Sequence, residues 1–143
     1  MATATGVLIP GSIASINAPA DFNDNPTLTS LGGNVSGPDF ANVLLDDLAI
    51  DVPDESLDYM AKSSQEGGFI DPPLKRQPDI VVAGQPAYHL AGKDVAFNSW
   101  ADEYGFRYQG HDITVVISTP LDMPQAERDA LAAPVLASLT LQG

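Results

Sequence analysis

Residues 80–119 constrain the fold more than any other segment, because they predict two β-hairpins in succession. In "IVVAGQPAYHLA", Gly84 provides the turn between strands 80–82 and 86–91. Pro86 can begin the returning strand, where no backbone donor is required. The strands "SWADEYGFRY" and "DITVVIST" form the second hairpin, joined at residues 109–112. Strands that are linked by such short turns pair antiparallel, so this segment predicts an antiparallel sheet.

The last strand of this segment also predicts a core face. Ile113, Val115 and Ile117 alternate with Thr114, Val116 and Ser118. Successive side chains of a strand point to opposite faces of the sheet. The isoleucine and valine set at the odd positions is therefore expected to face the core.

The N-terminal part of the chain predicts further strands before the first helix. We expect a flexible leader over residues 1–10, a strand from Gly11 that ends at the turn "APADF", a strand over 27–31 closed by Gly32-Gly33, and a strand over 40–50. In the last of these strands, the pair Asp46-Asp47 indicates a bulge or an exposed end.

Two helices are predicted, one on each side of the hairpin segment. The first begins near Asp54, the expected N-cap residue, and runs to Gln65; its apolar stripe is Leu57, Met60, Ala61 and Ser64. The second is capped by Asp122 with Gln125 three residues later, and its apolar stripe is Leu131, Val135 and Leu139. Pro134 is expected to kink this second helix or to end it early.

These elements predict the fold class and the domain organisation. Strands, a helix, two hairpins and a helix follow one another, without the alternating strand–helix units that a parallel sheet requires. We therefore predict an α+β fold in which an antiparallel β-sheet is flanked by helices. A chain of 143 residues suits one domain, which we place at residues 11–143.

The charge balance excludes several classes of function. The net charge is −13, and the six basic residues form no stripe along the sequence. Such a surface repels nucleic-acid backbones, so we expect no nucleic-acid partner. No apolar run is long enough to span a bilayer, so no transmembrane segment is expected. The chain has no cysteine and no phosphate-binding glycine loop, and we predict no cofactor.

Two histidines and an acidic run are the residues that a catalytic or metal site would use. His89 and His111 are the only imidazoles, and a zinc site without cysteine would need both of them and a carboxylate. The acidic run over residues 46–58 lacks the glycine-centred loop of a calcium site. We therefore predict neither a metal site nor a catalytic residue. A small hydrolase or metal enzyme that uses His89 or His111 remains the alternative from another class.

Aromatic residues form the candidate binding site. Trp100, Tyr104, Phe106 and Tyr108 lie on one predicted strand, and the last three share a face. Tryptophan and tyrosine are enriched at the energetic centres of protein interfaces. Two hypotheses follow: these side chains either pack beneath a helix or line a sheet surface that binds a partner protein.

The order of these segments resembles that of the PsbP-like superfamily, which includes actinobacterial LpqN-type lipoproteins and DcrB-like proteins. The resemblance covers roughly residues 11–141. It is carried by "INAPADF", "ESLDYMAKSSQ", the Gly-x-Pro-Ala hairpin "IVVAGQPAYHLAGK" and the C-terminal "GHDITVVISTPLDMPQAERDALAAPVLASLTL". It implies an α/β/α sandwich in a family whose characterised members bind other proteins, and it carries over no catalytic residue.

From this resemblance we expect a non-enzymatic, LpqN-like module of the bacterial cell envelope that binds a protein partner. LpqN-type proteins carry a signal and a lipidated cysteine, and neither is present in this sequence. An extracytoplasmic location therefore requires that a signal was removed, together with any lipid anchor; otherwise the protein is cytoplasmic. The alternative in the same fold is a cytoplasmic adaptor for secreted effectors, similar to the Eag chaperones. The sequence predicts no particular oligomeric state.

Overall fold

Strands make up most of the computed structural model, which describes residues 2–68 and 70–142. The elements are, in chain order, β1 (Leu8–Pro10), β2 (Ala14–Asn17), β3 (Thr27–Leu28), β4 (Gly32–Ser36), the short helix η1 (Pro38–Phe40), β5 (Asn42–Ala49), α1 (Leu57–Gly67), β6 (Lys75–Val82), β7 (Gln85–Asp94), the short helix η2 (Val95–Phe97), β8 (Ser99–Tyr108), β9 (His111–Pro120), α2 (Gln125–Ala137) and β10 (Thr140–Leu141).

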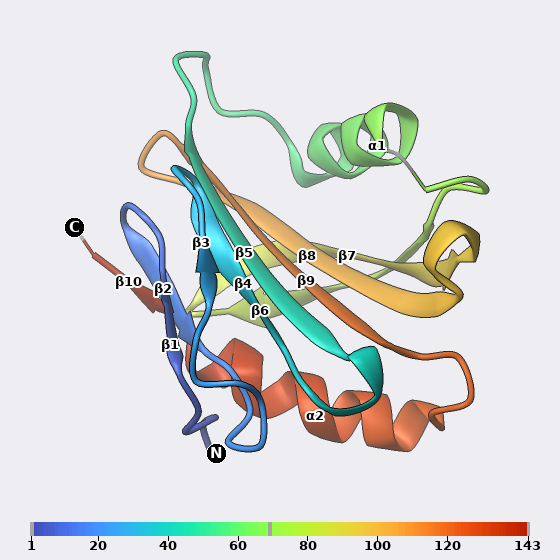
Figure 1. Cartoon of the computed structure of the whole chain (residues 1–143). Coiled ribbons are helices and arrows are strands. Elements are labelled where there is room, and N and C mark those ends of the chain that lie inside the picture. Colours follow the sequence, from blue (N-terminus) through green and yellow to red (C-terminus); the bar gives the residue numbers. More distant parts are fainter. Residues whose placement is uncertain (1, 69, 143) are drawn as a thin grey trace.

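A seven-stranded sheet in the order β3-β4-β5-β9-β8-β7-β6 forms the centre of the fold. All of its neighbouring strands pair antiparallel. Figure 1 shows α1 over one face of this sheet and α2 across the opposite face. The predicted α+β class, with an antiparallel sheet flanked by helices, is therefore confirmed.

Both predicted hairpins are present, and left-handed backbone conformations form their turns. Ala83 and Gly84 have φ angles of 51° and 78°, and Gln109 and Gly110 have φ angles of 47° and 76°. Positive φ at both central residues matches the right-handed twist of the paired strands. Pro86 is the second residue of β7, and β6 begins at Lys75, five residues earlier than predicted.

The main core lies between the seven-stranded sheet and α2. Ile113, Val115 and Ile117 are buried there, as their alternation predicted. Val43 and Leu45 of β5 are buried in the same cluster, which Val135 of α2 also joins. This layer removes the largest apolar side chains from water, and such burial is the main favourable contribution to folding.

The predicted flexible leader is wrong for the described part of residues 1–10. β1 pairs with β2, and β10 pairs with the other edge of β2, in a separate three-stranded sheet beside the main core. Ile9 is fully buried, and the amide of Ala4 donates to the carbonyl of Pro134 at 2.9 Å. Burial of Ile9, pairing with β2 and the bond to Pro134 therefore hold this segment against the rest of the fold.

Both helix starts differ from the prediction. Ser56 caps α1, because its hydroxyl accepts from the amide of Tyr59, whereas Asp54 lies outside the helix. α2 begins after Pro124, which makes no side-chain cap, so Asp122 does not cap it. Pro134 lies within α2, and the helix ends at Ala137, three residues later.

Two strand predictions also change. Strand β3 spans only Thr27–Leu28, and the glycine pair Gly32-Gly33 begins β4 instead of closing the strand before it. β5 pairs with β9 in continuous register from Asn42 to Ala49, so Asp46-Asp47 forms neither a bulge nor an exposed end. Asp47 is buried because distant residues supply its hydrogen bonds, as described below.

The second face of the sheet carries a smaller core. α1 packs on β7 and β8, where Ala61 meets Tyr88 and Leu90. The apolar stripe predicted for this helix faces the sheet as expected. A helix rises only about 1.5 Å per residue, against about 3.3 Å in a strand, so α1 is shorter than the strands beneath it. A hollow remains between the helix and the sheet.

Candidate functional site

The hollow under α1 is the candidate functional site. It consists of two adjoining cavities of about 280 Å³ and 350 Å³, which share Ser64, Gly68 and Glu103. We call the first of these the α1 pocket. Its lining is Ser64, Gln65, Gly68, Ile70, Pro73, Leu74, Leu90, Asp94, Phe97 and Glu103.

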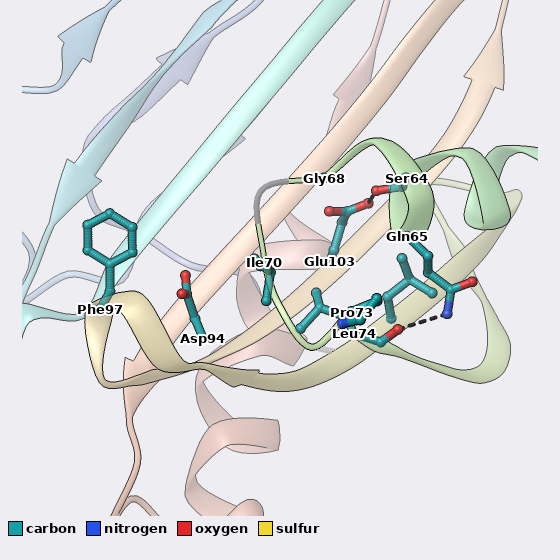
Figure 2. A pocket seen from close by; sticks show the side chains of 10 residues that line it. Ser64, Gln65, Gly68, Ile70, Pro73, Leu74, Asp94, Phe97 and Glu103 are labelled. Atoms are coloured by element: carbon teal, nitrogen blue, oxygen red, sulfur yellow. Dashed lines mark hydrogen bonds between the residues drawn. The ribbon is translucent and has the colours of Figure 1, made fainter.

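The segment that follows α1 forms one wall of the α1 pocket. Ile70, Pro73 and Leu74 lie on this segment, and Figure 2 shows them on the side opposite Ser64. The side-chain amide of Gln65 donates to the carbonyl of Leu74 at 2.8 Å. This bond ties the wall to the last turns of the helix.

Glu103 of β8 is the polar centre of the pocket. Its Oε2 accepts from the hydroxyl of Ser64 at 2.5 Å and from the hydroxyl of Tyr88 at 2.7 Å. Burial raises the pKa of Tyr88 above its ordinary value, and the charge of Glu103 raises it further. The tyrosine therefore keeps its proton over the physiological range and acts as a hydrogen-bond donor.

Gly105 makes this arrangement possible. A Cβ atom at position 105 would lie 2.4 Å from the ring of Tyr88, which is closer than any van der Waals contact allows. The aromatic ring can therefore lie flat on β8, with its hydroxyl directed at Glu103 two residues away. A larger residue at position 105 would displace the ring and break the hydrogen bond.

Exposed apolar side chains flank the mouth of the α1 pocket. Phe97 and Val95 of η2 are 81% and 64% exposed. Asn98, which follows them, adopts a left-handed conformation with φ 51° and ends the short helix. Phe97 both lines the pocket and faces solvent (Figure 2). Large aromatic side chains that are held in water in this way are characteristic of contact surfaces.

The predicted aromatic site is on the other face of the sheet. Tyr104 and Phe106 are buried in the core beneath α2, with 7% and 2% of their surface exposed. Tyr108 packs against the edge of that core. Trp100 is half-buried, and the guanidinium of Arg128 lies 4.3 Å from its ring centre. Tyr104, Phe106 and Tyr108 therefore pack in or against the core beneath α2, which agrees with the first of the two hypotheses for these three residues.

His89 is held by two neighbours on the same face. Its Nε2 lies 2.8 Å from a carboxylate oxygen of Asp102, and its ring stacks on Tyr104 at a centroid distance of 4.4 Å. Burial, with the charges of Asp102 and Asp129, raises the pKa of Tyr104. The sequence predicted a surface or edge position for His89, whereas it is half-buried in β7, one strand in from the edge.

His111 forms a second imidazole–carboxylate pair. Its Nδ1 lies 2.6 Å from Oδ1 of Asp47, whose side chain is fully buried. The other oxygen of Asp47 accepts from the backbone amides of Ile13 and Ala14 at 2.6 and 2.9 Å. Asp47 therefore joins β5 and β9 to β2. Both carboxylate oxygens of Asp47 therefore take part in hydrogen bonds that hold the fold together.

Within residues 2–68 and 70–142, no group of three potential metal-binding side chains comes together. Across the same residues, neither helix is long and apolar enough to cross a bilayer. Glu103, which lines both cavities, accepts from two hydroxyl groups and from no imidazole.

Sequence reasoning did not select Glu103, Tyr88 or Phe97 as site residues. Phe97 belongs to the same aromatic-rich segment, but its exposure depends on η2, which no sequence pattern predicted. The one available signal was the alternation of β8, which places Glu103 on the face opposite Tyr104 and Phe106.

Comparisons with known proteins support the fold. Neither a family model nor a curated protein sequence matches this chain. The solution structure of cyanobacterial PsbP (CyanoP) from Synechocystis sp. PCC 6803 superimposes with a TM-score of 0.59 at 13% identity, covering 93% of this chain and 91% of that one. A crystal structure from Bacteroides thetaiotaomicron gives a TM-score of 0.58 at 10% identity. It covers 94% of this chain, which corresponds to 47% of that chain, about half its length. The chain therefore has a PsbP-like fold.

Proposed function

We propose that this PsbP-like fold serves as a non-enzymatic protein-binding module of the bacterial cell envelope, with the α1 pocket and Phe97 as its contact surface. The observation that carries the proposal is the exposure of Phe97, at 81%, on the rim of a cavity with apolar walls. An aromatic anchor beside a pre-formed hollow is a common arrangement at protein interfaces.

The two imidazoles support a binding role over catalysis. His89 and His111 each interact with a carboxylate, and the partner of His111, Asp47, also accepts from two backbone amides. A catalytic imidazole needs a reacting group within hydrogen-bond reach. The residues that line the α1 pocket include no histidine. The envelope location rests on the resemblance to LpqN-type proteins and remains part of the proposal.

Photocrosslinking in cells that naturally make the protein tests the contact surface. A photoreactive phenylalanine analogue at position 97 should give a discrete crosslinked species with one protein, recovered in the envelope fraction. The same analogue at Glu127, which is exposed on α2 across the sheet, is the matched control. With the purified partner, Phe97→Ala should weaken binding by roughly thirtyfold or more, because interface anchors cost at least about 2 kcal/mol on truncation.

Three results would contradict the proposal. Equal crosslinking from positions 97 and 127 would show that the contact is not specific to the α1 pocket. No crosslink in any fraction would remove the evidence for a partner. A partner whose chemical conversion requires His89 or His111 would make the protein an enzyme.

A further inference from the structure

Glu103 is a half-buried carboxylate without a cationic partner among the described residues. The ion pairs formed within residues 2–68 and 70–142 do not include it. Its two recorded donors, Ser64 and Tyr88, are neutral hydroxyls, and both bind Oε2. Carboxylates that are removed from water are normally paired with a cation, since an unpaired charge in such a place is costly.

The basic residues near this face have other partners. Arg107, whose side chain is 5% exposed, interacts with Asp112, Asp54 and Glu55. Arg76 interacts with Asp58 and Asp79. The net charge of −13 adds a general attraction for cations. A cation for Glu103 would therefore have to come from another molecule.

The shape of the α1 pocket selects the kind of cation. Ile70, Leu74 and Leu90 provide apolar walls, and Glu103 lies among the same lining residues. The cavity of about 280 Å³ has room for an extended alkyl chain. Lysine and arginine side chains combine an apolar stem with a cationic head, so both parts would find a matching surface. A hydrated metal ion would leave the apolar walls unused.

We propose that the α1 pocket binds a lysine or arginine side chain of the partner protein, with its stem against Leu74 and Leu90 and its head on Glu103. This inference rests on the proposed binding function and specifies the chemistry of the partner segment. Phe97 at the mouth would contact apolar residues that neighbour the basic one. The partner segment is therefore basic and apolar, which complements an acidic protein.

Two matched peptides test the proposal on the wild-type protein. The first is acetyl-Ala-Leu-Lys-Leu-Ala-amide, and the second has norleucine in place of lysine, which keeps the stem and removes the charge. In amide chemical-shift titrations, the lysine peptide should bind roughly tenfold more tightly, since hydrogen bonds to charged groups are the stronger ones. The shifts should centre on Ser64, Gly68 and Leu90.

Two variants then test whether Glu103 is the group that contacts the lysine. Glu103→Gln keeps an oxygen that can accept from Ser64 and Tyr88, and it should remove most of the preference for lysine over norleucine. Glu127→Gln makes the same chemical change on the opposite layer and should leave the preference intact. Thermal melts of both variants check folding. The comparison of the two peptides on the wild-type protein stands even if Glu103→Gln unfolds.

Several outcomes would overturn the inference. Equal affinity for the two peptides would show that the pocket does not recognise the positive charge of the lysine. A lysine preference that survives in Glu103→Gln would place the charge contact elsewhere. Free butylammonium that binds as tightly as the lysine peptide would indicate a site for small amines instead of a partner segment. A specific crosslink from position 97 together with any of these results would leave the binding function intact and refute only the assigned chemistry.

Discussion

Replacing Asp47 by alanine tests whether the His111–Asp47 pair is structural. The carboxylate is fully buried and accepts from Ile13, Ala14 and His111, at distances between 2.6 and 2.9 Å. Alanine removes the acceptor from three donors at once. A buried donor that is left without a partner costs about 1–3 kcal/mol, and breaking a buried ionic pair costs about 3–5 kcal/mol.

Three unpartnered donors would together cost about 3–9 kcal/mol, and the structure places this variant in the lower part of that range. The ring of His111 is 17% exposed and can recover a hydrogen bond to water, whereas the amide of Ala14 is buried. We therefore expect Asp47→Ala to lower the free energy of unfolding by about 3–5 kcal/mol. With a shift of roughly 2–4 °C per kcal/mol for a chain of this size, the Tm should fall by about 6–20 °C.

Urea unfolding followed by circular dichroism measures the change directly, and the neighbouring residue supplies the control. Asp46 lies on the opposite face of β5, and burial raises its pKa, so its charge is unfavourable in the fold. Asp46→Ala should therefore change stability by less than about 0.5 kcal/mol or should stabilise. A loss of under about 1 kcal/mol in Asp47→Ala would refute the structural role and restore His111 as a candidate catalytic base.

Three further predictions follow from backbone conformation and burial. Gly84→Ala should lower the free energy of unfolding by about 1 kcal/mol, because φ of Gly84 is 78°. Gly67→Ala, at a helix end with open space around it, should raise the free energy of unfolding by up to about 1 kcal/mol in the same urea assay. Asp46→Asn should be more stable than the wild type at pH 7. The raised pKa of Asp46 means that its protonated form stabilises the fold, and this contribution is lost as pH rises through the folded pKa. Unfolding curves of the two proteins that still differ below about pH 4 would contradict this. In an ultraviolet titration, Tyr88→Phe and Tyr104→Phe should each remove a phenolate signal that appears at a pH above the ordinary tyrosine range. The stability of the wild type should fall as pH rises through these raised pKa values. If either variant instead loses a signal that titrates at a lower pH, the assignment is refuted.

Local patterns were sufficient for the centre of the fold. The two hairpins depend on residues within a few positions of each turn, and the alternation in β9 places Ile113, Val115 and Ile117 on the core face without reference to any other segment. The apolar stripe of α1 likewise depends only on the spacing of residues within the helix. For this reason the order of strands and helices, and the antiparallel class, could be predicted from the sequence.

The cap of α1 shows where local reasoning fails. Asp54 and Ser56 are both good N-cap residues, and the sequence does not distinguish them. In the structure, Asp54 lies near the guanidinium of Arg107, which also contacts Asp112, and Ser56 caps the helix. The ionic partner of Asp54 lies more than fifty positions away in the sequence, beyond the reach of a local pattern.

The remaining differences between prediction and structure arise where short segments come together in the fold. The short strands β1 and β10 carry too little pattern to be predicted. β1 pairs with β2 across a short turn, whereas β10 reaches β2 from the other end of the chain. The carboxylate of Asp47 is buried only because β2 brings two amides to it. The α1 pocket likewise joins residues of α1, of the segment after it and of β7, η2 and β8. Periodicity acts over a few residues, whereas these contacts depend on how distant segments pack, and that packing made Glu103 and Phe97 a site.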